Sequence, residues 1–128
     1  MKFPKTKSFT GNKVLAIELL KAAKENIAVG GLRYLCNAVQ MESPTLADID
    51  DEEGYRKQVA ADEVECWIGS MCERHRENGS KVVDATQAFK DSAKEAGYTC
   101  RVQPWQDFAF NYRLAWADHL ISYLETSQ

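Results

Sequence analysis

The sequence predicts an all-α fold, a single-domain bundle of about five helices packed around a C-terminal helix with two apolar sides. Apolar residues recur every three or four positions in several segments, and no stretch shows the alternation that is typical of a strand. Hydrophobic residues make up 45% of the chain and charged residues 27%, as in ordinary globular proteins. At 128 residues the chain can bury one core, so residues 1–128 are expected to form one domain.

The first two helices are predicted from capping residues and apolar spacing. Thr10 and Asn12 are candidate N-caps for a helix that ends near Ala28, because two glycines follow at positions 30 and 31. Its apolar face consists of Leu15, Leu19, Ala23 and Ile27. A second stripe follows within residues 31–41 and consists of Leu32, Leu35, Cys36 and Val39. Because free cysteine packs as a small apolar residue, Cys36 is expected to be a core thiol.

Residues 53–76 are predicted to form a third helix, in which one face is apolar from residue 64 to residue 75. This stripe consists of Val64, Trp67, Ile68, Met71, Cys72 and His75. Cys66 lies about 200° around the helix from Val64 and is therefore expected on another face.

A fourth helix is predicted from Ser80, as its N-cap, to about Ala96. Its inner face consists of Val82, Ala85, Phe89, Ala93 and Ala96. Gly97 suits the left-handed position that follows a helix, and residues 98–103 are expected to form an extended connector.

The last helix is predicted over residues 104–125, with Pro104 in its first turn. One side carries Trp105, Phe108, Tyr112, Trp116, His119 and Tyr123, and the opposite side carries Phe110, Leu114, Ala117, Ile121 and Leu124. A helix that is apolar on two sides is either central to a bundle or covered by another chain. The central position is favoured here, and a homodimer or heteromeric interface through this helix is the alternative.

Two features are candidates for partner binding. Residues 42–53 are expected to form an acidic loop, within a segment, 41–65, that holds nine acidic and two basic residues. The candidate residues in this loop are Asp48, Asp50, Asp51, Glu52 and Glu53. A solvated loop is the structural interpretation, and docking of a basic partner is the functional one. Arg113 lies on an apolar flank, so it either pairs with an acid such as Glu18 or Asp84 or binds a partner's anion.

Cysteine and histidine residues leave a metal or small-molecule site open as an alternative. Cys72 and His75 form one Cys-x-x-His pair, and the further candidate ligands are Cys36, Cys66, Cys100 and His119. Structural zinc usually uses two closely spaced pairs of ligands, and only one pair is present. No metal or cofactor is therefore predicted.

Nucleic-acid binding is a second alternative, through a basic N-terminal arm at residues 1–9. Its candidate residues are Lys2, Lys5, Lys7 and, just beyond the arm, Lys13. A net charge of −3 and the lack of a basic helical stripe argue against this class of partner. The chain lacks the motifs of common enzyme classes, a signal segment and an apolar run long enough for a membrane span, so we expect a cytoplasmic non-enzyme with no membrane partner.

Two blocks carry a resemblance to a known group of proteins: RYLCNAV at 33–39 and RLAWADHLISYLE at 113–125, with Trp67 and Ile68 between them. Together they resemble small helical proteins encoded by bacteriophages and prophages. That group has no established activity, so the resemblance implies no catalytic residues. It implies an accessory protein that binds a host factor, such as a component of a defence system, and inhibits or diverts it.

Overall fold

The computed structural model describes residues 1–30, 34–44, 51–76, 79–98 and 104–126. Five α-helices lie in this part of the chain: α1 (Lys13–Gly30), α2 (Leu35–Met41), α3 (Glu52–Ser70), α4 (Gln87–Glu95) and α5 (Pro104–Thr126). Between α3 and α4 lie two short strands, β1 (Glu73–Arg74) and β2 (Lys81–Val82), and a 3-10 turn, η2 (Val83–Ala85). The predicted all-α bundle is therefore confirmed.

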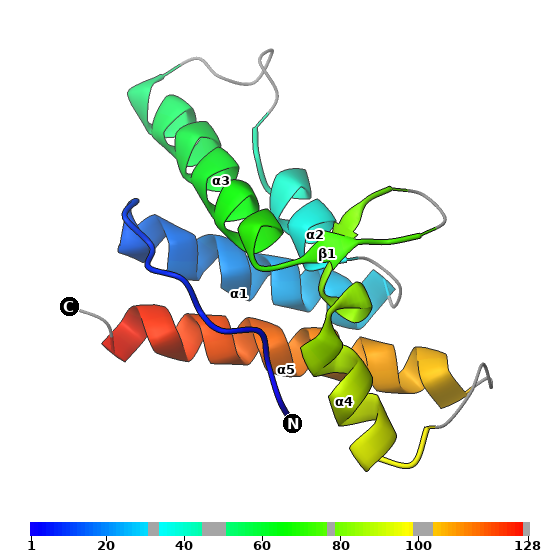
Figure 1. The fold of residues 1–128 in the computed structure, drawn as a ribbon. Helices are drawn as coiled ribbons and strands as arrows, with labels where there is room; N and C mark the ends of the chain where they lie inside the picture. Colours follow the sequence, from blue (N-terminus) through cyan, green and yellow to red (C-terminus); the bar gives the residue numbers. More distant parts are fainter. Residues whose placement is uncertain (31–33, 45–50, 77–78, 99–103, 127–128) are drawn as a thin grey trace.

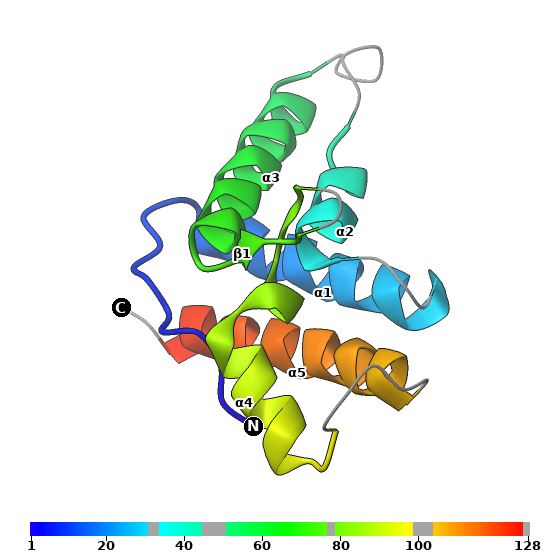
Figure 2. The ribbon, with the colours of Figure 1, turned by 45° about the vertical axis from the view of Figure 1, so that its right-hand side comes forward.

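The helices pack in layers around α1 and α5, which run side by side (Figures 1 and 2). On the side away from α5, α1 packs against α2 and α3, and α2 and α3 also pack against each other. On its other side α5 contacts α4 and η2. None of the described helices is both long enough and apolar enough to cross a membrane.

Both apolar sides of α5 take part in the core, as the sequence predicts. Tyr112 and Trp116 are fully buried on one side, and Ala117 and Leu124 are buried on the other. Phe110, Leu114 and Tyr123 are half-buried and pack against the same core. Prediction and structure differ at His119, which is exposed although its ring stacks on Phe3 of the N-terminal segment. The side chain of Trp105 lies outside the described residues.

The start of α1 and the end of α4 follow the predicted local signals. The Asn12 side chain accepts a hydrogen bond from the Leu15 N–H (3.0 Å), so Asn12 caps α1. Gly97 follows α4 with a φ of +94°, a conformation that costs glycine little and other residues more.

In α2, Leu35 and Val39 are buried and Cys36 is half-buried. Leu32 and most of the predicted connector at 98–103 lie outside the described residues.

The third helix is shorter than predicted, because α3 ends at Ser70 and not near residue 76. The chain then forms an antiparallel β1–β2 hairpin, with Glu73 opposite Val82. Gly79 makes the reversal possible with a φ of +72°, and its N–H donates to the His75 carbonyl (2.9 Å). The prediction that Cys72 and His75 continue a helical stripe is wrong, as is the absence of any strand.

The fourth helix begins later than predicted. Thr86, and not Ser80, is its N-cap: the Thr86 hydroxyl accepts a hydrogen bond from the Phe89 N–H (3.2 Å). Residues 81–85 instead form β2 and η2, in which Val82 and Val83 are buried. Phe89 and Ala93 are buried on the inner face of α4, as predicted.

The N-terminal segment, residues 1–12, crosses α5 (Figure 1) and forms hydrogen bonds with α5, α4 and α3. The Tyr112 hydroxyl donates to the Lys2 carbonyl (2.6 Å), and the Trp67 indole N–H donates to the Lys7 carbonyl (2.8 Å). Phe9 is buried against Trp67, with ring centroids 5.0 Å apart. This basic segment is therefore an integral part of the fold.

Replacement of Trp116 by alanine tests the central role of α5. Because Trp116 is fully buried, Trp116→Ala should lower the free energy of unfolding by about 3–5 kcal/mol in urea denaturation. The control is Tyr55→Ala, at a side chain that is 59% exposed, which should change it by less than about 0.5 kcal/mol. Equal effects of the two substitutions would contradict this packing.

Candidate functional site

The cysteine and histidine side chains do not gather at one place in the described part of the chain. Cys36 and Cys72 line one small enclosed space beside Trp116, whereas Cys66 is exposed on α3. His75 lies near the Tyr34 ring, and His119 stacks on Phe3 with ring centroids 4.8 Å apart. No group of three or more His, Cys, Asp or Glu side chains in this part could hold a metal ion. Cys100 lies outside the described residues.

Burial determines the chemistry of the two inner thiols. It raises the pKa of Cys72 from 9.0 to about 12, with a smaller contribution from Cys36, and it also raises the pKa of Cys36. A thiol with such a pKa stays protonated near neutral pH and is a poor nucleophile and metal ligand. Both thiols therefore act as packing groups.

This difference in burial predicts selective alkylation of the cysteines. At pH 8, a pKa of about 12 leaves about one part in ten thousand of Cys72 as thiolate. Iodoacetamide should therefore modify exposed Cys66 first and Cys72 only after unfolding, which mass spectrometry of peptides would show. Equal labelling rates of the two residues in the folded protein would contradict the assignment.

Arg113 makes one of the two ion pairs that the sequence allowed. Its Nε donates to Asp84 Oδ2 (3.0 Å), its Nη2 donates to the same oxygen, and its guanidinium carbon lies 4.7 Å from the centre of the Tyr34 ring. Only 8% of the Arg113 side chain and 10% of the Asp84 side chain are exposed. Of the two alternatives for Arg113, the structure shows the ion pair with Asp84, and it places the guanidinium in the interior.

The buried ion pair is incompletely satisfied. Asp84 Oδ1, Arg113 Nη1 and Trp116 Nε1 have no hydrogen-bond partner among the described residues. Burial raises the pKa of Asp84, and hydrogen bonding to Arg113 opposes that rise. The pair therefore fixes η2 against α5 at a cost in desolvation.

The acids at the start of α3 have structural tasks. The Asp51 carboxylate caps α3 by accepting a hydrogen bond from the Gly54 N–H (2.8 Å). Glu52 pairs with Arg56 one turn later (2.8 Å), and Glu53 also lies in the first turn, where the helix dipole favours negative charge. Asp48 and Asp50 lie outside the described residues. Structural roles within α3 therefore account for Asp51 and Glu52, and no binding protein is needed to explain them.

A pair of alanine substitutions separates capping acids from other acids. Asp51→Ala should lower the free energy of unfolding by about 1 kcal/mol, because it removes the side-chain acceptor of the Gly54 N–H at the start of α3. Asp62→Ala, within the same helix, should leave it almost unchanged. Thermal melting followed by circular dichroism compares the two, and an equal loss would contradict the capping role.

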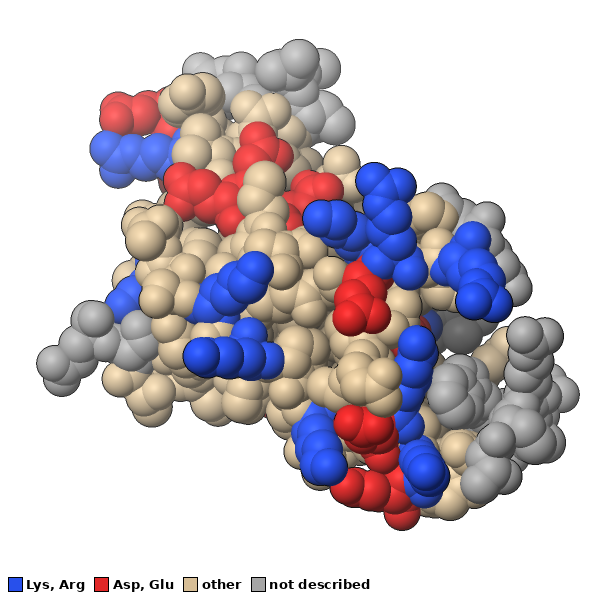
Figure 3. Space-filling model, in the orientation of Figure 1, with Lys and Arg blue, Asp and Glu red and all other residues tan. Residues whose placement is uncertain are grey.

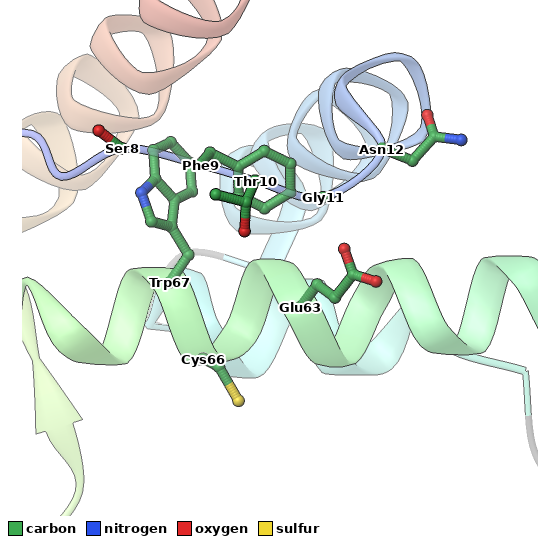
Figure 4. Close-up of a pocket in the computed structure, with 8 residues that line it drawn as sticks. All are labelled: Ser8, Phe9, Thr10, Gly11, Asn12, Glu63, Cys66 and Trp67. Carbon is green, nitrogen blue, oxygen red and sulfur yellow. The ribbon is translucent and has the colours of Figure 1, made fainter.

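Two open hollows flank the N-terminal half of the molecule. One, of about 810 Å³, lies between the starts of α1 and α3 and is lined by Val14, Glu18 and Glu53, among others. The second, of about 680 Å³, lies between residues 8–12 and α3 (Figure 4). Asn12 lines both hollows.

The second hollow has an acidic wall beside aromatic packing. In Figure 4, Glu63 points toward the N-terminal segment at Gly11, whereas Cys66 points away from that segment. A Cβ atom at Gly11 would lie 1.8 Å from Glu63 Oε2, so any larger residue would displace this carboxylate. The Trp67 and Phe9 rings pack together behind it. Glycine at position 11 therefore lets the segment pass close to Glu63.

The side of α3 opposite the core is an exposed surface that the sequence analysis did not predict. This α3 outer face consists of Tyr55, Val59, Asp62, Glu63 and Cys66, all of which are exposed. Acidic side chains gather over α3 in Figure 3. The spacing of Tyr55, Val59, Asp62 and Cys66 is itself helical, so the sequence held a signal for this face. The exposed position of Cys66 agrees with the prediction that it lies away from Val64.

The lysines of the N-terminal segment are partly engaged within the fold. Lys2 forms an ion pair with Glu95 (3.1 Å), and the Lys7 ammonium donates to the Ser70 carbonyl (2.9 Å).

Comparison of the sequence with models of protein families and with curated proteins, and of the fold with solved structures, gives no match. The function is therefore inferred from the surface of the molecule.

Proposed function

We propose that the protein is a non-catalytic protein-binding module and that the α3 outer face is its binding surface. The exposure of Tyr55 (59%) and Val59 (36%) on a helix whose opposite side is buried carries this proposal. Apolar side chains grouped on one exposed face favour contact with another macromolecule. Tyrosine is moreover a residue type that often contributes strongly to protein interfaces.

The form of the neighbouring hollows supports a binding role. Both are open to solvent, whereas small-molecule sites usually enclose most of their ligand. The raised pKa of Cys72 also argues against its use as a nucleophile. A solvent-open, mixed apolar and acidic surface is better suited to a protein than to a small substrate.

The resemblance to phage and prophage proteins extends the proposal to the kind of partner. On that basis the partner is a bacterial host factor, such as a defence component, which the protein inhibits or diverts. A homodimer through α5 receives less support, because most apolar residues of this helix pack within the chain.

The proposal predicts that polar substitutions on the α3 outer face abolish partner capture. Tagged protein is incubated with bacterial lysate, and bound proteins are identified by mass spectrometry. The double variant Tyr55→Ser with Val59→Ser should retain a specifically bound protein roughly tenfold less well, since an interface residue of this kind contributes more than about 1 kcal/mol.

The matched control is Val29→Ser with Met41→Ser, which alters two apolar side chains that are 91% and 55% exposed on α1 and α2. This control should capture the partner as well as the unmodified protein does. Circular dichroism establishes that both variants are folded. Capture that is unaffected by the α3 substitutions, or lost equally in the control, would refute the proposed surface.

A further inference from the structure

The second half of α3 has an uncompensated negative charge. Residues 58–70 contain three acids, Asp62, Glu63 and Glu65, and no lysine or arginine. No basic residue therefore lies three or four positions from any of them, where helical neighbours could pair. The first half of the helix differs, since Arg56 there pairs with Glu52.

These three acids are also without a tertiary counterion. None of them makes an ion pair with another described residue. Burial and the charge of Asp62 together raise the pKa of Glu65, so like charges are held close together. A cation brought by a partner would relieve this repulsion.

Along the same surface, apolar side chains are followed by acids. Val59 lies one turn after Tyr55, Asp62 and Glu63 lie one turn after Val59, and Glu63 forms the wall of the hollow beside Gly11. A chain lying along α3 would meet apolar surface first and negative charge next. The hollow at Glu63 is open and could accept a long side chain.

We infer that the partner binds the α3 outer face through a basic amphipathic polypeptide segment, with apolar side chains over Tyr55 and Val59 and a lysine or arginine at Glu63. This inference rests on the proposed function and specifies its partner. The charge complementarity selects this occupant, because opposite charges steer association and fix its register. The same acids would repel phosphate groups, which disfavours nucleic acid and anionic lipid on this face.

A peptide titration of the full chain, followed by amide resonances in NMR, tests the inference. The probe is a synthetic helical peptide with leucine on one side and lysine on the other, and the matched peptide has glutamate in place of lysine. The lysine peptide should shift resonances of residues 52–70, with an affinity that falls as salt is added. Glu63→Gln with Asp62→Asn should weaken binding about tenfold.

A control variant distinguishes an effect of the acids on α3 from an effect of the net charge of the protein on peptide binding. Asp107→Asn with Glu125→Gln removes two exposed acids of α5 and changes the net charge by the same amount, so it should leave binding unchanged. Equal weakening by both variants would overturn the inference, as would an absence of shifts with the lysine peptide. Equal binding of the glutamate peptide to residues 52–70 would refute only the requirement for basic side chains in the partner. Shifts confined to another face would also contradict the proposed binding surface.

Discussion

The side chains of α5 are removed from water on two sides, and the remaining elements are arranged around this burial. Tyr112 packs against Phe89 of α4 and Phe3 of the N-terminal segment, whereas Trp116 lines a small space together with Leu35 of α2 and Val83 of η2. Ala117 and Leu124 are buried on the other side of the helix. A helix of this kind cannot be left at the surface, because it would expose a large apolar area. Burial of α5 therefore requires α1, α4, η2 and residues 1–12 to cover it together.

Polar groups within this core determine how the covering elements are aligned. Arg113 on α5 holds Asp84 of η2, and the Tyr112 hydroxyl holds the Lys2 carbonyl of the N-terminal segment. A buried hydrogen bond adds only modest stability, but loss of one partner leaves the other desolvated and unsatisfied. These contacts therefore favour one alignment of η2 and residues 1–12 over others that would bury similar apolar area.

The same arrangement explains why α3 is available for binding. It packs against α1 and α2 with one side only, through residues such as Val64 and Ile68, and no described element covers its opposite side. Tyr55, Val59 and the acids around Asp62 contribute little to the core. A surface that the fold does not need can carry a binding function at little cost in stability, which supports the partner-binding interpretation.

The sequence by itself determined the helical class, the two-sided burial of α5 and several local signals. Asn12 at the start of α1 and Gly97 after α4 could be assigned because capping and left-handed turns depend on a few adjacent residues. The ion pair of Arg113 could be expected because a charge on an apolar flank requires a partner. Only the tertiary structure decided that the partner is Asp84 and that α3 gives way to a hairpin before Cys72. It also decided that residues 1–12 pack on α5 at Tyr112, because hydrophobic periodicity describes one segment at a time, whereas burial depends on which distant segment covers it.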